Sequence, residues 1–241
     1  MRLLVTRPEP EATATAEKLR TLGHEPVLQP LLEIVFRAPP ERLPDPAALI
    51  LTSGNGLRAM ELWPQAAEWH DKPLFVTGLA TATAARAAGF RDVHTSGTDS
   101  GDLADLIVTD LPRDRRPVLY PAARDRTAGF SLGLRANGYD IRTVEAYAAE
   151  IVGSVEPEII ESLRSGGIDG ILLYSRRTAE ALRKLIEAEA LLAGLKDTTI
   201  YTFSLRIAEP LEGLGLAIRI ALNPDEKSLF ALLPANADPP R

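Results

Sequence analysis

Short apolar segments alternate with helical patterns along the whole chain, and this alternation constrains the fold more than any other feature of the sequence. The segment "ALILTS" at 48–53 precedes an amphipathic run, "PLFVTG" at 73–78 precedes the Ala-rich "LATATAARAAG", and "GILLYS" at 170–175 precedes "RRTAEALRKL". Strands that alternate with helices in this way predict an α/β fold with parallel sheets. In "EPVLQPLLEIVFR", Pro26 and Pro30 predict an edge strand or a crossing segment.

The two halves of the sequence repeat this plan. The segment "LILTSGNGLRAM" pairs with "ILLYSRRTAEAL", and "LFVTGLATATAARAAG" pairs with "IYTFSLRIAEPLEGLG". Each pair shares a strand, a polar turn and a helix, and the second pair also shares a closing glycine. The pairing predicts a duplicated α/β unit, with two domains that face one another. The final segment "PANADPPR" at 234–241 is expected to be a disordered tail.

Composition excludes several classes of protein. The 241 residues contain no cysteine, which excludes disulfides and thiolate chemistry, and the net charge of −6 argues against a nucleic-acid partner. No apolar run approaches the roughly 18 residues that span a bilayer, and "MRLLVTRPEP" turns polar too early for a signal peptide, so we expect a cytoplasmic protein without a membrane partner. His24, His70 and His94 share no spacing that suits a metal site.

Polar or small residues follow the predicted strands. In doubly wound sheets, ligands bind outside the carboxyl ends of the strands, and in a two-domain protein such ends can line a common cleft. The residues at these positions are Thr6, Ser53, Gly78, Pro121, Ser175 and Ser204.

Three kinds of chemistry could use these strand ends. "GNGLRA" at 54–59 fits a dinucleotide fingerprint, but the following strand lacks the acidic residue that holds a ribose. Ser53 and Ser175 could act in hydrolysis, but neither lies in a nucleophile elbow. The third possibility is anion binding by helix N-termini, whose free N–H groups would act together with nearby hydroxyls and arginines. The arginines concerned are Arg7, Arg124, Arg126, Arg176 and Arg206.

Serine and threonine also cap helices whatever the function, so plain capping remains an alternative for each hydroxyl taken singly. Capping does not, however, require an arginine near five strand ends or two matched domains. A ligand with many carboxylates, held across a cleft without a metal, accounts for both.

Several segments together resemble the uroporphyrinogen-III synthase family. They are "LLVTRPEPEATATAEKLRTLGHEPVLQPLLEI", "LILTSGNGLRAM", "VTGLATATAARAAG" and "YPAARDRTAGFSLGLRANGYDIRTVEAY". The chain departs from the family at 204–208, where "SLRIA" stands in place of the usual Gly-Pro-Thr-Thr-Ala, so that Arg206 and Ile207 replace a pair of hydroxyls. Arg206 could supply a guanidinium for carboxylate binding, or it could point outward.

The resemblance implies a monomer of two similar, flavodoxin-like α/β domains with a cleft between them. Residues 1–33 and 150–233 would form one domain and 38–145 the other, joined by extended linkers at 34–37 and 146–149. The family converts hydroxymethylbilane, a linear tetrapyrrole with eight carboxylates, into uroporphyrinogen III. The substrate loses water, the ring closes and the terminal pyrrole is inverted, without a cofactor or a metal.

The resemblance also implies roles for individual residues. Tyr147 corresponds to a tyrosine of the second crossing that is thought to assist departure of the hydroxyl group; alternatively, it packs between the domains. Ser53, Thr81 and Ser175 match polar positions that line the cleft. The remaining predicted substrate-binding residues are Thr6, Arg7, Arg124, Arg126, Ser204 and Arg206. The alternative functions are a non-catalytic two-domain binding protein for a polyanionic metabolite and, less favoured, a nucleotide-dependent transferase.

Overall fold

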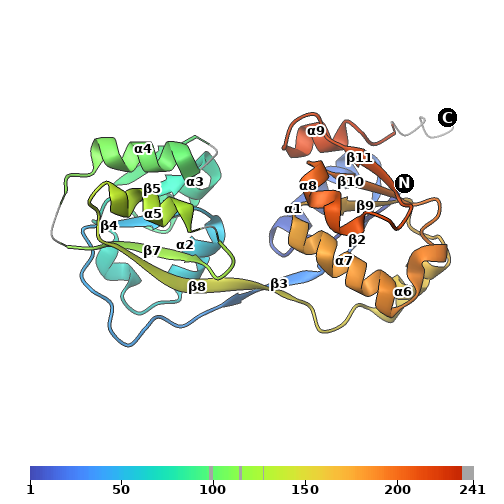
Figure 1. Ribbon diagram of the computed structural model, residues 1–241, viewed down its shortest axis with the longest axis horizontal. Coiled ribbons are helices and arrows are strands. Elements are labelled where there is room, and N and C mark those ends of the chain that lie inside the picture. Colours follow the sequence, from blue (N-terminus) through green and yellow to red (C-terminus); the bar gives the residue numbers. More distant parts are fainter. Residues whose placement is uncertain (98–99, 114–115, 127, 235–241) are drawn as a thin grey trace. The chain divides into compact units, whose positions relative to one another are not determined.

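The structure of the protein is a computed structural model that describes residues 1–97, 100–113, 116–126 and 128–234 (Figure 1). Apart from Pro234, the predicted tail at 234–241 lies outside these residues. The chain divides into two compact units: unit 1 comprises Met1–Glu33 and Glu150–Arg241, and unit 2 comprises Ile34–Ala149. Within the described ranges, no helix has both the length and the apolar character needed to cross a membrane.

Unit 1 contains a five-stranded sheet with the order β11-β10-β9-β1-β2, and each neighbouring pair is parallel. The central strands β1 and β9 are almost wholly apolar, as expected for strands that helices cover on both faces. Pro26 lies in β2 at the edge of the sheet, in agreement with its predicted place. The strands are β1 (Arg2–Val5), β2 (Glu25–Leu28), β9 (Gly170–Leu173), β10 (Thr199–Thr202) and β11 (Ala217–Ile220).

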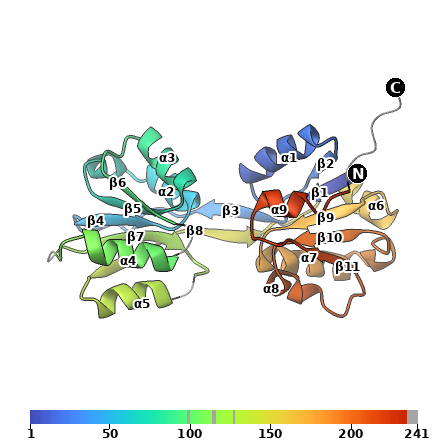
Figure 2. The same cartoon turned by 90° about the horizontal axis from the view of Figure 1, so that it is seen from above.

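Helices cover both faces of this sheet (Figure 2). The core on one face joins residues of β1 and β9 to Ala12 and Leu19 of α1 and to Leu229 of α9. Helices α7 and α8 lie on the other side (Figure 2), and α7 buries Ala179, Leu182 and Ile186, which share one helical face. The helices are α1 (Glu11–Thr21), α6 (Pro157–Arg164), α7 (Arg176–Ala188), α8 (Leu205–Ala208) and α9 (Glu226–Phe230).

Unit 2 is built on a six-stranded sheet with the order β3-β8-β7-β4-β5-β6. The pairs from β8 to β6 are parallel. At the β3 edge, the Arg37 N–H donates to the Ala146 carbonyl and the Val152 N–H donates to the Leu31 carbonyl, so β3 and β8 run antiparallel. The strands are β3 (Leu32–Phe36), β4 (Ala48–Leu51), β5 (Leu74–Thr77), β6 (Val93–Ser96), β7 (Val118–Ala123) and β8 (Ile141–Ile151).

Alternate residues of β4 divide the core of unit 2 between two layers. Leu49 and Leu51 pack with α2 and α3 on one face, and Ala48 and Ile50 pack with α4 and α5 on the other (Figure 2). The helices are α2 (Gly54–Glu61), α3 (Leu79–Ala87), α4 (Ser100–Asp110) and α5 (Gly129–Ala136).

The two sheets have the same spatial order once β9 is matched with β4. The series β11-β10-β9-β1-β2 then corresponds to β6-β5-β4-β7-β8. This matching agrees with the sequence pairs, because β9 with α7 corresponds to β4 with α2, and β10 with α8 corresponds to β5 with α3. The units differ in chain order: unit 1 reads 2-1-3-4-5, as in flavodoxin-like folds, whereas the parallel strands of unit 2 read 3-2-1-4-5. Both units thus have the predicted parallel-sheet α/β architecture, and unit 1 also has the flavodoxin-like strand order.

Each sheet has one point at which the direction of the strand order reverses. It lies between β9 and β1 in unit 1, and between β4 and β7 in unit 2. Loops that leave the two strands of such a pair diverge to opposite faces, which opens a crevice at the carboxyl ends. The residues that follow β9, β1, β4 and β7 are therefore the first place to look for a ligand site.

Candidate functional site

Ser53 follows β4 at the reversal point of unit 2 and begins helix α2. Its backbone is extended, with φ of −163° and ψ of 148°, and its Oγ accepts a hydrogen bond from the Asn55 N–H at 3.2 Å. Ser53 is therefore the N-cap of α2, as the sequence indicated. The capping bond still leaves the hydroxyl proton of Ser53 and a second lone pair for another partner.

Tyr147 lies on β8 beside the end of β7, at a β-bulge. Ala122 is opposite Glu145, but the next residue, Ala123, is opposite Tyr147, so Ala146 is an extra residue in β8. The Arg124 N–H donates to the Tyr147 carbonyl at 2.8 Å and fixes the strand there. A bulge changes the side to which the following side chains point, and Ala146 and Tyr147 both join the core on the α2 face. The bulge thus directs the tyrosine ring toward α2.

The phenol of Tyr147 lies near the Ser53 hydroxyl, which acts to lower the pKa of the phenol. Burial raises the pKa of this phenol and outweighs the opposing effects of the Ser53 hydroxyl and the Arg58 charge; the nearby Tyr120 phenol raises it further. A tyrosine with a raised pKa stays protonated at neutral pH. It can therefore donate a hydrogen bond to a ligand oxygen.

Gly56 allows α2 to approach the end of the sheet closely. A Cβ at this position would lie 3.0 Å from Leu51 Cδ2, 3.1 Å from the Pro121 carbonyl oxygen and 4.0 Å from Tyr147 Cε1. In a dinucleotide fingerprint, the second glycine leaves room for the pyrophosphate. Here protein atoms already occupy that room, so the "GNGLRA" pattern serves packing against β7.

Sequence reasoning missed two further polar residues near Tyr147, namely Tyr120 and Arg58. The hydroxyls of Thr52 and Tyr120 are hydrogen-bonded at 2.9 Å, and the Arg58 guanidinium donates to the Asn55 side-chain oxygen. Tyr120 lies within a buried strand, where a tyrosine is more often a packing residue. The signal in the sequence was Tyr120, a polar residue in the middle of an apolar strand. Its partner Thr52 follows the neighbouring strand β4, so only the structure shows the pairing.

The other predicted residues of unit 2 lie around this group. Thr81 is in the first turn of α3 and is buried. Arg124 is half exposed, and its Nε lies 3.8 Å from Asp125 Oδ2. The Arg126 guanidinium donates to the Ala123 carbonyl at 2.5 Å and so braces its own loop. The structure thus joins Tyr147 directly to the backbone of Arg124, brings Ser53 near the Tyr147 phenol, and places Thr81 on the neighbouring helix.

Unit 1 presents corresponding caps at its own strand ends. The Ser175 Oγ accepts from the Thr178 N–H at 3.1 Å and lies 2.8 Å from the Thr178 hydroxyl. Ser204 caps α8 by accepting from the Ile207 N–H at 3.4 Å. Arg206 is exposed on the same short helix. Ser175 and Ser204 therefore occupy helix N-termini as predicted, each with a local capping bond.

Thr6 and Arg7 follow β1 and have partners within unit 1. The Thr6 hydroxyl is fully buried and donates to the Leu172 carbonyl at 2.6 Å, which ties β1 to β9. The Arg7 guanidinium donates to Glu226 at 2.9 Å and to the Thr15 hydroxyl at 3.2 Å. Thr6 thus supports the strand end, whereas Arg7 belongs to a charged cluster.

The described residues favour neither a metal centre nor a serine hydrolase. Across the described ranges, no group of three or more His, Asp or Glu side chains could hold a metal ion. His94 pairs with Asp92 at 2.8 Å and stacks on Phe75, and His70 packs edge-on against Phe90. The hydrogen bonds found for the Ser53 and Ser175 hydroxyls involve no histidine.

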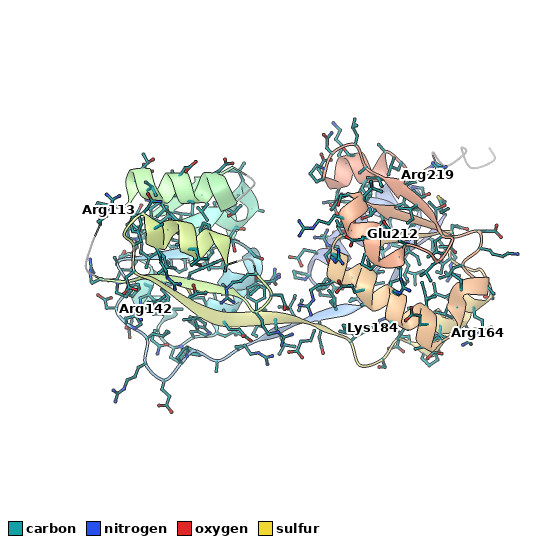
Figure 3. All side chains as sticks on the ribbon, viewed as in Figure 1. Arg113, Arg142, Arg164, Lys184, Glu212 and Arg219 are labelled. Atoms are coloured by element: carbon teal, nitrogen blue, oxygen red, sulfur yellow. The ribbon has the colours of Figure 1, made fainter. Side chains whose placement is uncertain are left out.

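Two hollows lie away from these strand ends. One of about 940 Å³ in unit 2 is lined by Arg42, Arg135 and Arg142, the last at the start of β8 and thus at the amino end of the sheet (Figure 3). One of about 380 Å³ in unit 1 is lined by Lys184, in the second half of α7 (Figure 3). The polar chemistry of the strand ends, rather than the size of a hollow, identifies the candidate site.

Comparison with known proteins gives one family and several related folds. The model of a family described as uroporphyrinogen-III synthase HemD matches residues 13–231. A sequence comparison with curated proteins finds no match. Uroporphyrinogen-III synthetase from Helicobacter pylori has a similar structure, with 18% sequence identity and a TM-score of 0.66, over 96% of each chain.

A mutant uroporphyrinogen III synthase from the extremely thermophilic bacterium Thermus thermophilus is also similar, with 17% identity and a TM-score of 0.52, over 96% of this chain and 97% of that one. Likeness at this level of identity establishes the fold. The family match, which spans most of the chain, is a separate finding that rests on sequence.

Proposed function

The chain belongs to the uroporphyrinogen-III synthase family, and from this premise we propose that it is a lyase that converts hydroxymethylbilane into uroporphyrinogen III without a cofactor. Water leaves the hydroxymethyl group, the ring closes and the terminal pyrrole is inverted. The reaction has no net oxidation or reduction, so it needs no redox partner. The observation that carries the proposal, beyond family membership, is the buried and protonated phenol of Tyr147 beside Ser53 at the reversal point of sheet β3-β8-β7-β4-β5-β6.

We assign to Tyr147 the role of hydrogen-bond donor to the departing hydroxyl oxygen. Its raised pKa keeps the proton on the phenol, and the partial negative charge that develops on the leaving oxygen strengthens a hydrogen bond at that point. Ser53, held at the start of α2, lies near the phenol and shapes its polar surroundings. Tyr147 is the catalytic residue in this scheme, and Ser53 is a positioning residue.

Binding of the substrate requires donors for eight carboxylates. We propose that strand-end donors of both units contribute, and that the two units are the two domains of a monomer. Ser53, Ser175 and Ser204 mark helix N-termini, where N–H groups and the helix dipole favour anions. Arg124 and Arg206 add guanidinium groups near the same ends. Thr81 has a secondary place in this scheme, because its side chain is buried.

The energetic demand on such a site is modest. The bilane closes unaided to the unrearranged isomer, so the enzyme has to favour one path over another. A 100-fold preference corresponds to about 2.7 kcal/mol of transition-state free energy. A hydrogen bond to a charged group contributes roughly 1.5–3 kcal/mol. A few contacts that hold the chain of pyrroles in the closing conformation are therefore sufficient, which is catalysis by positioning.

The proposal is tested with freshly prepared hydroxymethylbilane and separation of the oxidised product isomers. We expect isomer III to predominate and the substrate to disappear faster than in buffer. Isomer I at the uncatalysed rate would reject the proposal. Tight binding of the bilane together with that result would instead support the binding-protein alternative.

A further inference from the structure

Four donors surround one carboxylate at the reversal point of the unit 1 sheet. Arg7 follows β1 and Tyr174 follows β9, and these two strands are neighbours. Thr15 and Lys18 lie on α1, which covers the same face of the unit 1 sheet as α9. All four side chains are directed at Glu226, the first residue of α9.

The contacts occupy both oxygens of Glu226. Its Oε1 accepts from Arg7 Nη1 at 2.9 Å, from the Thr15 hydroxyl at 2.6 Å and from the Tyr174 phenol at 3.1 Å. Its Oε2 accepts from Lys18 Nζ at 2.5 Å. The Arg7 guanidinium also lies 4.2 Å from the centre of the Tyr174 ring, which fixes its plane. Two cations and two hydroxyl groups thus converge on a single carboxylate.

The pKa values of the cluster show what this arrangement favours. Burial alone would raise the pKa of Glu226, but the hydrogen bonds from Lys18 and Thr15 and the charges of Lys18 and Arg7 hold it below its ordinary value. Burial, followed by the negative charge of Glu226, raises the pKa of Tyr174. The group therefore stabilises a carboxylate anion and keeps a protonated phenol as one of its donors.

The donors and the carboxylate come from parts of the unit that differ in their anchoring. The donors lie at the ends of two central strands and on an 11-residue helix. Glu226 lies on a helix of five residues, near the end of the described chain. The side chains of Arg7 and Glu226 are 24% and 20% exposed, so solvent reaches the contact. With Arg7 and Lys18 against one Glu226, the cluster keeps a net positive charge.

A hollow of about 600 Å³ adjoins the cluster. Lys18 and Glu226 belong to its lining, together with the apolar side chains of Leu22 and Phe230. A ligand with a carboxylate and a flat apolar body matches both parts, because the carboxylate meets the donors and the body meets the apolar wall.

We propose that Arg7, Thr15, Lys18 and Tyr174 form a binding site for a ligand carboxylate, and that Glu226 fills this site as an internal competitor in the free protein. The identity of the ligand as an acetate or propionate arm of the bilane rests on the proposed function. When the arm binds, it takes the place of the Glu226 carboxylate, and the four donors keep their positions.

Chemical rescue tests the site without any assay of activity. Glu226→Ala leaves the donors without a carboxylate, and sodium propionate is then titrated against sodium chloride at equal ionic strength while Tm is followed. At about ten times the dissociation constant, we expect propionate to raise Tm by about 3–6 °C more than chloride does. The control is Glu209→Ala, which removes an exposed glutamate paired with Arg176 in the same unit; it should respond equally to both salts.

Further variants locate the response and guard against a folding defect. Adding Arg7→Ala to Glu226→Ala should abolish the propionate effect, and an effect that persists would place the binding elsewhere and overturn the proposal. Where Glu226→Ala does not fold, Glu226→Gln, which keeps the size of the side chain, takes its place in the same titration. Equal responses to propionate and chloride in the folded variant also overturn the proposal.

The exchange with substrate is tested separately. With hydroxymethylbilane, Glu226→Ala should lower KM, because the competing carboxylate is gone. A raised KM in a folded variant means that Glu226 supports the structure alone. If the protein does not act on the bilane, the propionate titration still decides on the carboxylate site, so the two proposals fail by different results.

Discussion

Replacement of Gly56 by alanine tests how closely α2 must approach the sheet. The new Cβ would lie 3.0 Å from Leu51 Cδ2 and 3.1 Å from the Pro121 carbonyl oxygen, so the first turn of α2 has to move by a few tenths of an ångström. Ser53, the N-cap of α2, moves with that turn and shifts against the nearby Tyr147 phenol. The substitution should therefore reduce both stability and activity.

The expected loss of stability is the difference between two opposing effects, overpacking and helix propensity. Overpacking costs roughly 1–3 kcal/mol, and alanine gains up to about 1 kcal/mol over glycine in a helix. A net loss of about 1–2 kcal/mol lowers Tm by about 2–8 °C in a chain of this length. Displacement of Ser53 changes the polar surroundings of the Tyr147 phenol, and a loss of about 0.5–1.5 kcal/mol in transition-state stabilisation lowers kcat by about 2- to 10-fold.

Gly54→Ala is the matched control for this substitution. It lies in the same helix turn, but a Cβ there meets nothing within 4 Å. Thermal unfolding and the rate of bilane turnover should remain close to wild type in Gly54→Ala and fall in Gly56→Ala. Equal behaviour of the two variants in both assays would refute the claim that close packing of α2 positions the site.

Three other predictions concern the strand ends and the pH dependence of stability. Leu79 and Leu205 are the matched first residues of α3 and α8, and they are 75% and 71% exposed. Leu79→Ser and Leu205→Ser should raise KM several-fold if these leucines contact pyrrole rings of the substrate. Leu222→Ser, at a site that is 92% exposed, should not raise KM. Arg206→Ala should raise KM if the guanidinium binds a carboxylate, and an unchanged KM places Arg206 outside the site. Burial and then the charge of the N-terminus lower the pKa of His24, so the folded state binds fewer protons than the unfolded state as pH falls below about 6.5, and stability should decrease there. Tm measured from pH 7.5 to 5 should fall less in His24→Gln than in wild type, and parallel curves would contradict this origin.

Local patterns in the sequence predict the α/β fold and the helix caps. Ser53, Ser175 and Ser204 each follow an apolar strand and precede an amphipathic run, and each accepts a hydrogen bond from its own helix. These signals are confined to a few residues, so they can be read along the chain. The different strand orders of the units could not be read in this way, because the pairing of β1 with β9 joins residues more than 160 positions apart.

The functional contacts depend on such distant pairs. Arg7 meets Glu226 across 219 positions and Thr52 meets Tyr120 across 68, and neither pair has a local signal. The direction of Tyr147 is set by the extra residue Ala146, which shifts the alternation of β8 against β7. The resemblance thus pointed to Tyr147 from the sequence, whereas its position near Ser53 required the structure.

The most direct measurement is the rate and isomer composition of product formed by Tyr147→Phe under single-turnover conditions. The account predicts that loss of the phenolic hydroxyl slows bilane consumption by about tenfold or more, while the product formed above the uncatalysed background remains isomer III. Tyr201→Phe, at a buried tyrosine of β10, should match wild type in both respects. Wild-type consumption by Tyr147→Phe would contradict the role given to the Tyr147 phenol.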